Sequence, residues 1–324
     1  MYHKSEQEIM RKWRNTSDTP KVSICSISYN QQNFIEEALD SFLMQRTDFP
    51  FEILIDDDCS TDKTGEIIGR YMREYPNIIN ARIRTENIGS MSNFIENIER
   101  AKGRYIAMCE GDDFWTSPLK LQKQVDFLEN NDSFSGCFHD CKRIYENMER
   151  KENLRVGKRK IEHEPDLISV INENNIATAS IVFKNLEGIM PPYWKKTTKG
   201  DYALMLTIAE KGKLKYLPEV MSVYRVHDKG IWSSCGEIYK EKENIKFYSL
   251  LRKHFSGRTE VLSEIEKKIK YSYFIMARKL TYEKKRVLSI YYMFLSFSFF
   301  NKKHKGIDYT RYIKELLKST WRMR

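Results

Sequence analysis

The sequence lacks several features that assign chains to common classes of protein. It contains no run of about 18 apolar residues, so we expect no transmembrane helix. Its first ten residues are mostly polar and lack the apolar core of a secretory signal, so we expect a cytoplasmic protein. No internal repeat and no low-complexity segment occurs. These absences favour a folded enzyme or binding domain over a membrane-spanning, secreted or repeat protein.

Cysteine is scarce and poorly placed for a metal or a disulfide framework. The six cysteines are at positions 25, 59, 109, 137, 141 and 235. Cys137, His139 and Cys141 have poor spacing for half a zinc site, and no second pair lies at a useful distance. We therefore expect reduced thiols, as is usual in the cytosol.

Charge is abundant but unevenly distributed. The 324 residues carry a net charge of +10, and 41% of them are hydrophobic, which indicates a folded protein. Residues 237–324 contain 22 Lys and Arg against 9 Asp and Glu, so the remainder has a net charge of −3. A slightly acidic main domain argues against nucleic-acid binding, which favours a basic one. The length suits one large α/β domain with a smaller appendage.

An acidic turn follows an apolar stretch near the middle of the chain. Residues 105–109 are apolar and predict a buried strand, which stops at Glu110, Asp112 and Asp113. Adjacent carboxylates at the end of a buried strand are costly unless a cation or hydrogen-bond donors face them. Mg²⁺ and Mn²⁺ prefer such oxygen ligands, together with phosphate oxygens and water. The alternative is a solvated acidic turn that caps a helix beginning near Ser117.

Two other predicted strands also end in polar residues. Residues 51–55 run into Asp56, Asp57 and Asp58, and residues 22–27 run into Ser28, Tyr29 and Asn30. An amphipathic helical pattern follows each of them, at residues 34–43 and 64–75. Strands that alternate with helices form a parallel sheet, and its carboxyl ends meet at one edge. The three polar ends should therefore converge on one cleft, which favours a ligand site over a solvated turn.

At this point the residues resemble a known family. The stretches that carry the resemblance are Ser28-Tyr29-Asn30, Glu36, Gln45, Asp57-Asp58-Cys59-Ser60-Thr61-Asp62, Asn87-Ile88-Gly89, Gly103-Arg104-Tyr105, Gly111-Asp112-Asp113, Gly200-Asp201 and Tyr224-Arg225-Val226-His227. Their order and spacing are similar to family 2 glycosyltransferases of the GT-A fold over about residues 21–232. The resemblance implies a Rossmann-like α/β fold with a mixed, mainly parallel sheet flanked by helices. It leaves roughly the last ninety residues uncovered.

The resemblance implies roles for the residues at the strand ends. Asp58 would contact the nucleotide base or ribose, and Ser28 and Tyr29 would lie beside the base. Asp113 would bind Mn²⁺ or Mg²⁺, and Asp112 would touch the ribose or a metal-bound water. A bound metal would stabilise the departing diphosphate as a Lewis acid.

The later motifs supply the remaining roles. Asp201 would be the general base, and its place at a helix start predicts a lowered pKa; a plain N-cap is the alternative. Arg225 would bind the diphosphate, and His227 would bind the metal or a phosphate; a surface histidine is the alternative. Gly200 stands where the family more commonly has Glu.

Four further positions receive no firm role. Glu110 departs from the Thr, Asp or Leu that is commoner there, so it either adds charge to the site or faces solvent. Asp56 replaces a residue that is often apolar or small in the family, and we assign it nothing. Arg84 and Asn93 are weaker candidates for nucleotide contact than Asp58.

The predicted function is an inverting glycosyltransferase that uses a nucleotide-diphosphate sugar, with UDP favoured by family frequency. Its acceptor would be a saccharide or lipid-linked glycan in surface polysaccharide synthesis. One alternative is an inactive, membrane-docked scaffold of the same fold. The other is a nucleotidyltransferase, although residues 28–34 lack the expected Gly-rich phosphate loop with Lys or Arg.

The expected organisation has an arm, a catalytic domain and a basic extension. These are residues 1–20, residues 21–235 (nucleotide-binding half 21–125, acceptor half 126–235) and a helical region at 236–324. Further strands are expected at 81–84, 134–138, 176–183 and 214–226, further helices at 91–101, 119–128 and 201–211, and an exposed charged excursion at 142–165.

The basic extension contains an unusual aromatic segment. Residues 287–300 are mostly apolar and aromatic, with Lys and Arg at 284–286 and Lys at 302–303. The segment is too short to span a bilayer, but its composition suits the interface of an anionic membrane. The chain would then be peripheral at the inner face of the cell membrane. A helix packed on the catalytic domain is the alternative.

Overall fold

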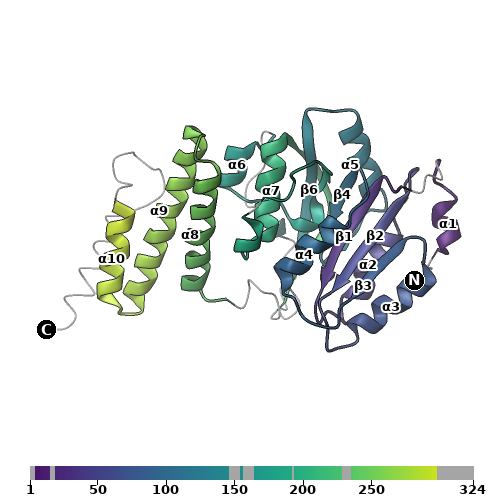
Figure 1. The fold of residues 1–324 in the computed structure, drawn as a ribbon, viewed down its shortest axis with the longest axis horizontal. Helices are drawn as coiled ribbons and strands as arrows, with labels where there is room; N and C mark the ends of the chain where they lie inside the picture. The colour runs from purple at the N-terminus through teal and green to yellow at the C-terminus, as the bar shows by residue number, and fades with distance from the viewer. Residues whose placement is uncertain are drawn as a thin grey trace. The chain divides into compact units, whose positions relative to one another are not determined.

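The chain divides into two compact units, Met1–His227 and Asp228–Arg324. A computed structural model describes residues 4–14, 19–145, 154–155, 164–191, 193–227 and 235–297 (Figure 1). The predicted domain boundaries at residues 20, 125 and 235 stay predictions.

The first unit is built on one mixed sheet. Its strands, in the described part of the chain, are β1 (Val22–Ser28), β2 (Phe51–Asp57), β3 (Ile79–Ile83), β4 (Tyr105–Met108), β5 (Phe114–Trp115), β6 (Phe134–Tyr145), β7 (Leu154–Arg155), β8 (Val182–Lys184) and β9 (Lys213–Val226). They lie in the order β3-β2-β1-β4-β8-β6-β9-β5, with β7 beside β6. β3, β2, β1 and β4 are parallel neighbours, β6 and β9 are parallel to each other, and β8, β5 and β7 pair antiparallel. The predicted mixed, mainly parallel sheet is confirmed.

The parallel half is held by apolar strands and amphipathic helices. Every residue of β4 is buried, as are six of the seven in β1 and in β2, as expected for a sheet covered on both faces. The helices of this unit are α1 (Glu6–Met10), α2 (Ile35–Leu43), α3 (Thr64–Glu74), α4 (Ser90–Glu99), α5 (Lys120–Glu129), α6 (Leu167–Asn172) and α7 (Gly200–Lys211), with 3₁₀ turns η1 (Thr178–Ser180) and η2 (Trp194–Lys196). Figure 1 shows β1, β2 and β3 side by side with α2, α3 and α4 around them.

α2 illustrates why these sequences form helices. It buries Ile35, Ala38, Leu39 and Phe42, which recur every three or four residues, while Glu36 lies on the exposed side. Its burial against the sheet stabilises it more than intrinsic helix propensity does. The register of β1 with β2 pairs Ser28 with Asp57, and β1 with β4 pairs Cys25 with Met108. The carboxyl ends of the three strands therefore lie together, as the sequence predicted.

Three expectations need correction. The strand at 176–183 is wrong, because residues 178–180 form the turn η1 and only 182–184 pair in the sheet as β8. Residues 142–145 are not part of an exposed excursion, because β6 continues through them along β9. The rest of the predicted excursion lies mostly outside the described residues, at 146–153 and 156–163. The arm at 1–20 includes the short helix α1, whose Ile9 is buried in the main core.

The second unit contains the helices α8 (Glu237–His254), α9 (Thr259–Tyr282) and α10 (Arg286–Phe297) among its described residues. α9 buries Val261, Ile265 and Ile269, and farther along it Phe274 and Ala277 pack with Met293 of α10. The predicted helical character is confirmed for residues 237–297, and the rest of the region, 298–324, lies outside the described residues. None of the helices in the described residues is long and apolar enough to cross a membrane.

Candidate active site

The acidic turn after β4 is shaped by Gly111. The Gly111 N–H donates to the carbonyl of Ile27 (3.0 Å), which ties the turn to the end of β1. A Cβ at this position would lie 2.5 Å from Oε1 of Gln31 and 2.8 Å from Cδ1 of Ile35, so a side chain there would displace the ends of both of these side chains. The Asp113 N–H donates back to the carbonyl of Glu110 (3.0 Å). The chain therefore turns tightly and presents two successive carboxylates at the sheet edge.

Asp112 and Asp113 meet residues from the end of β9. Oδ1 of Asp113 accepts the Arg225 N–H (2.9 Å), and Oδ2 of Asp112 lies 3.0 Å from Nε2 of His227. Burial, and then the charge of Asp112, raise the pKa of Asp113 well above its usual range, while the Arg225 N–H opposes that rise. Oδ1 of Asp112 is buried and has no hydrogen-bond partner in the described part of the chain. The turn therefore holds more negative charge than its neighbours neutralise.

Arg225 braces this turn from the other side. Its guanidinium donates to the carbonyl of Asp112 (2.6 Å), forms an ion pair with Glu37 and lies over the rings of Phe114 (4.5 Å) and Phe34 (5.2 Å). The His227 ring also packs on Phe34, with 5.0 Å between centroids. These contacts cover both faces and the end of the Arg225 guanidinium, and the residue is only 6% exposed. Its predicted contact to a diphosphate stays a prediction and requires that it leave Glu37.

Asp201 is the second residue of the helix α7, which begins at Gly200 with Lys199 as its N-cap, so the alternative of a plain N-cap at Asp201 is wrong. Burial raises its pKa, and the Tyr202 N–H and Lys199 oppose that rise. The expected lowering of this pKa by the helix terminus is therefore wrong, because desolvation of the carboxylate outweighs the helix dipole. A carboxylate with a raised pKa is a stronger base, which suits proton removal.

Glu110 connects Asp201 to the acidic turn. The pKa of Glu110 is raised to about 8, first by burial and then by the charges of Asp112 and Asp201. Glu110 therefore lies close enough to each of these two carboxylates to be repelled by it. We call Glu110, Asp112, Asp113 and Asp201 the acidic cluster. The sequence left Glu110 open between the site and solvent, and the structure places it with the site.

The ends of β1 and β2 hold the predicted nucleotide residues. Asp58 is buried, and its Oδ1 accepts the Ile88 N–H (2.8 Å), while Asn87 donates its side-chain amide to the carbonyl of Asp58 (3.0 Å). Ser28 donates its hydroxyl to Asp57 (3.0 Å), so that hydroxyl is already engaged. Tyr29 is 49% exposed beside them. The structure brings Ser28, Tyr29 and Asp58 together, but their contact with a base stays a prediction.

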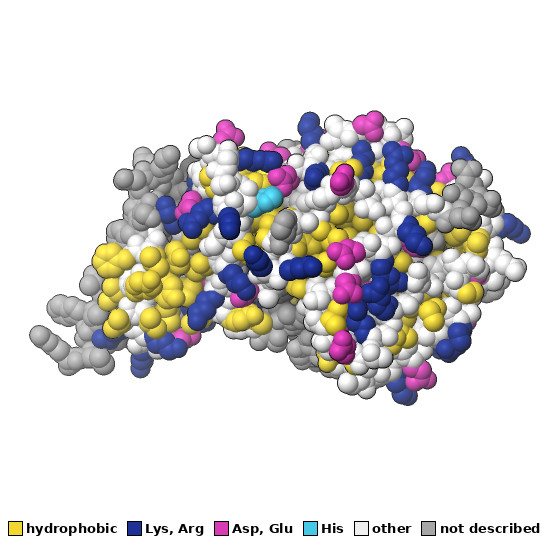
Figure 2. All heavy atoms as spheres, viewed as in Figure 1, with side chains coloured by type: hydrophobic (Ala, Val, Ile, Leu, Met, Phe, Trp, Pro, Cys, Tyr) yellow, Lys and Arg dark blue, Asp and Glu magenta, His cyan; other side chains and the backbone are white. Residues whose placement is uncertain are grey.

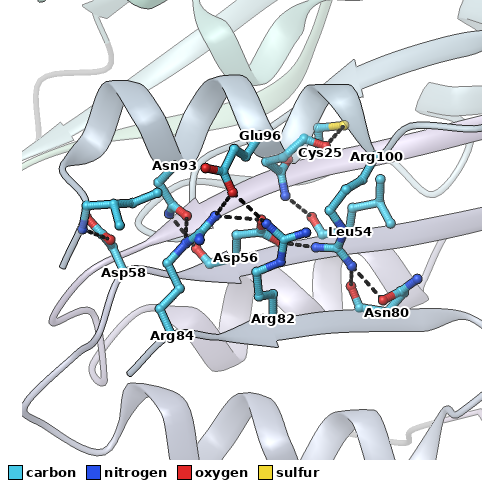
Figure 3. A network of polar contacts seen from close by, with 12 residues as sticks. Cys25, Leu54, Asp56, Asp58, Asn80, Arg82, Arg84, Asn93, Glu96 and Arg100 are labelled. Atoms are coloured by element: carbon cyan, nitrogen blue, oxygen red, sulfur yellow. Dashed lines mark hydrogen bonds and ion pairs between the residues drawn. The ribbon is translucent and has the colours of Figure 1, made fainter. Parts of the chain in front are cut away.

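A second group of charged residues, arranged around the buried Asp56, lies beside Asp58 (Figure 3). Asp56 is fully buried and forms an ion pair with Arg100, and its other oxygen lies 3.7 Å from Arg84 and 3.8 Å from Arg82. Glu96 of α4 accepts hydrogen bonds from both Arg82 (2.7 Å) and Arg84 (2.8 Å). We call Asp56, Arg82, Arg84, Glu96 and Arg100 the balanced cluster, because three cations surround two acids.

Asn93 links the balanced cluster to the backbone of β2. Its side-chain amide donates to the carbonyl of Asp56 (2.8 Å), and its carbonyl oxygen accepts from Nε of Arg84 (2.9 Å). Arg84 and Asn93, the weaker candidates for nucleotide contact, are thus occupied with each other and with Asp56. The sequence missed the balanced cluster, although three arginines near an unexpected buried Asp would have signalled it.

The acidic cluster has the donors that a hard divalent cation prefers. Carboxylate oxygens of Asp112 and Asp113 and the ring nitrogen of His227 lie together, and one oxygen of Asp112 is buried without a partner in the described residues. Mg²⁺ and Mn²⁺ are commonly held by one or two carboxylates, with substrate phosphates and water completing the shell. These residues could therefore supply some of the ligands of such an ion. They do not form a full site, because the described residues contain no group of three or more His, Cys, Asp or Glu that could hold a metal ion.

Comparisons with known proteins agree with this geometry. The sequence profile described as glycosyl transferase family 2 matches residues 23–184. An uncharacterized protein of Mycobacterium tuberculosis is 41% identical over 217 residues, which are 66% of this chain and 61% of that protein. The chain thus spans about 61% of the length of such mycobacterial relatives.

Two proteins whose names state an activity are also similar to this chain. The Escherichia coli protein WfaP, a UDP-Glc:alpha-D-GlcNAc-diphosphoundecaprenol beta-1,3-glucosyltransferase, is 31% identical over 218 residues, which are 64% of this chain and 77% of WfaP. Among solved structures, the mannosyltransferase PcManGT of Pyrobaculum calidifontis in complex with GDP-Man and Mn²⁺ matches with a TM-score of 0.56 at 15% identity, over 98% of this chain and 94% of that one. The structural likeness confirms the GT-A fold.

Proposed function

Because the chain belongs to glycosyl transferase family 2, we propose that it is an inverting, metal-dependent transferase that uses a nucleotide-diphosphate sugar. The observation that carries the proposal is that Asp58 and Asp113 follow two strands of the parallel half at the same edge of the sheet, and that Asp201 interacts with the turn that holds Asp113. Asp58 follows β2, Asp113 follows β4, and Asp201 is coupled to the same turn through the charge of Glu110. An inactive scaffold would have no need for so many buried acids, each of which destabilises the fold.

The residues divide the reaction between them. Asp201 removes the proton from an acceptor hydroxyl, and that oxygen attacks the anomeric carbon of the donor sugar. The bond from the anomeric carbon to the diphosphate breaks on the opposite face, so a single displacement inverts the configuration. Asp58 holds the nucleoside by accepting hydrogen bonds. Asp113, with Asp112 and His227, would hold Mn²⁺ or Mg²⁺, which when bound supplies Lewis-acid stabilisation of the leaving diphosphate.

The donor and acceptor are proposed from the relatives. WfaP uses a UDP sugar and a diphosphoundecaprenol-linked acceptor, which supports UDP and a lipid-linked or saccharide acceptor in surface glycan synthesis. The Mn²⁺ in the PcManGT complex supports a divalent metal. A lipid-linked acceptor would place the enzyme at the inner face of the cell membrane, as a peripheral protein.

The test is thermal unfolding with UDP, GDP, dTDP and CMP, each with and without Mn²⁺. A nucleotide present at about 100 times its Kd should stabilise the fold by about 2.7 kcal/mol. We expect a metal-dependent rise of Tm with UDP in the wild-type chain, and no such rise in Asp113→Asn. Asp132→Asn serves as the matched control, because the side chain of Asp132 is 94% exposed and lies outside the acidic cluster.

The outcomes separate the competing functions. If UDP with Mn²⁺ still raises the Tm of Asp113→Asn, the metal site must lie elsewhere. No rise with any nucleotide would support the inactive scaffold. A rise with UDP should then be followed by transfer assays with UDP sugars, in which the anomeric configuration of the product tests inversion.

A further inference from the structure

α10 is an amphipathic helix whose apolar side faces outward. Val287, Ile290, Tyr291 and Phe294 recur at helical spacing, so they share one side of the helix. They are 83%, 46%, 56% and 72% exposed, and Leu288 beside them is 50% exposed. A surface helix of a globular protein normally turns such a stripe toward the core.

The inward side of α10 combines buried hydroxyls with an apolar contact. Ser289 and Ser296 are fully buried, and Met293 packs with Phe274 and Ala277 of α9. The Ser289 hydroxyl donates to the carbonyl of Ala277 (2.8 Å) and lies 2.6 Å from the hydroxyl of Thr281. Buried hydroxyls at a helix–helix contact, with large apolar residues outside, are typical of helices that face lipid.

Positive charge adjoins this apolar side. Lys284 and Lys285 precede α10 and are exposed, and residues 237–324 as a whole carry 22 Lys and Arg against 9 Asp and Glu. Lys285 pairs with Glu283 (2.8 Å), but such an exposed ion pair is weak and exchangeable. Figure 2 shows hydrophobic side chains gathered over α10 with Lys and Arg along their border. Basic residues beside an apolar patch complement anionic lipid headgroups.

The length of α10 limits how it meets a membrane. Its 12 described residues give a helix of about 18 Å, whereas the hydrocarbon core of a bilayer is about 30 Å thick. It therefore suits a helix that lies in the interface with its apolar side among the acyl chains. A second copy of the chain fits less well, because two such faces would bring their basic borders together.

We propose that the outward side of α10, formed by Val287, Leu288, Ile290, Tyr291 and Phe294, docks on the surface of an anionic phospholipid bilayer, with Lys284 and Lys285 against the headgroups. The proposal concerns the second unit alone. It stands whether or not the acidic cluster transfers a sugar.

The test is sedimentation of the full chain with vesicles of phosphatidylcholine, with and without phosphatidylglycerol. We expect the wild-type chain to bind the mixed vesicles and Val287→Gln/Ile290→Gln to bind them at least tenfold more weakly. Burial of a single aliphatic side chain already strengthens binding by at least about tenfold. Gln preserves helix propensity, so α10 should remain folded. The matched control is Met72→Gln/Val220→Gln, which replaces two exposed apolar residues of the first unit (37% and 46% exposed) and should bind as the wild type does.

A second pair of measurements tests the charge and the insertion. Lys284→Asn/Lys285→Gln should weaken binding by about fivefold for each lysine and reduce its salt dependence. Ile290→Trp should bind as the wild type does, and brominated lipids should quench its added fluorescence. This second readout does not depend on a destabilising variant.

Three results would overturn the proposal. The first is equal vesicle binding by the wild type and Val287→Gln/Ile290→Gln. The second is the absence of wild-type binding, as expected if another segment of the chain covers the face. The third is a wild-type dimer in light scattering that Val287→Gln/Ile290→Gln dissociates, without vesicle binding, which would assign the face to a second copy.

Discussion

The first unit holds two groups of acids at the ends of β2 and β4, strands that β1 separates in the sheet, and the charges around the two groups differ in sign. In the balanced cluster, Asp56 is surrounded by Arg82, Arg84 and Arg100, and it lies at the end of β2. In the acidic cluster, Asp113 at the end of β4 meets one backbone N–H and other carboxylates. The first group neutralises itself within the protein, whereas the second requires a cation or protons from outside. Burial alone therefore does not mark a functional acid; an excess of like charge around it does.

The largest expected effect comes from Asp201, which tests the catalytic side of this comparison. Asp201→Asn should lower kcat by about 10²–10⁴-fold, because it removes the general base. Tm should stay constant or rise, since burial disfavours this carboxylate and Asn removes its charge. Steady-state transfer kinetics and thermal unfolding measure the two quantities. Retained turnover in a folded Asp201→Asn protein would move the base to another residue, with Glu110 the first to examine.

Asp56 tests the structural side and should show the opposite pattern. Asp56→Asn removes the acid that three arginines face, and breaking a buried ion pair in this way costs about 3–5 kcal/mol of unfolding free energy. The kcat of the folded fraction should stay within a few fold of the wild type, because Asp56 touches no residue of the acidic cluster in the described contacts.

Chemical denaturation and kinetics at a temperature where the variant is folded would measure both effects. Asp132→Asn is the control for loss of an exposed carboxylate. A large loss of kcat with unchanged stability would show that the two clusters are not distinct in role.

The buried side chain of Lys120 extends the comparison from buried acids to a buried cation. Lys120 of α5 is fully buried, its Nζ lies 4.1 Å from the centre of the Trp115 ring, and it has no hydrogen-bond partner in the described part of the chain. Burial lowers the pKa of Lys120 from 10.5 to about 7. Between these two values the unfolded chain binds a proton that the folded chain does not, so stability from this group rises with pH.

Lys120→Met should remove that rise. The variant should be more stable than the wild type near pH 7, and the difference should shrink toward pH 9. Unfolding free energies of the wild type and the variant between pH 7 and 9 measure this difference. The range ends at pH 9 because burial raises the pKa values of the Cys109 and Cys137 thiols, which lowers stability at higher pH. A pH-independent difference would mean that Lys120 stays charged inside the fold.

The sequence was informative where a pattern is local. The strands at 22–27, 51–55 and 105–109 and the helices that follow 22–27 and 51–55 are confirmed, because buried parallel strands and amphipathic helices have strong periodicity. The strand at 176–183 was wrong because a buried apolar run has no period of its own, and the pairing of β8 with β4 and β6 decides its length. The meeting of Ser28, Asp58 and Asp113 followed from topology.

The site could be predicted less completely than the fold. The pKa of Asp201 depends on how much the surrounding chain excludes water, which no local motif encodes, so the expected effect of the helix terminus was wrong. The link between Arg225 and Glu37 joins residues 188 positions apart, and the three arginines around Asp56 come from β3, the residues after it and the end of α4. Such charge balance depends on tertiary contacts.

The smallest expected effect concerns Glu37, which holds the main cation beside the acidic cluster. If Arg225 leaves Glu37 for a diphosphate, Glu37→Gln removes a competitor and should tighten UDP binding. The increase should be at most about fivefold, because Glu37 is 45% exposed and an ion pair with an exposed acid contributes little free energy. Glu36→Gln is the matched control, since Glu36 pairs instead with Arg70 on the outside of α2 (2.6 Å). Titration calorimetry with UDP and Mn²⁺ measures the difference. Weaker binding by Glu37→Gln would instead assign Arg225 to bracing the turn, because the guanidinium would then act through Asp112 and Asp113 and not through the phosphates.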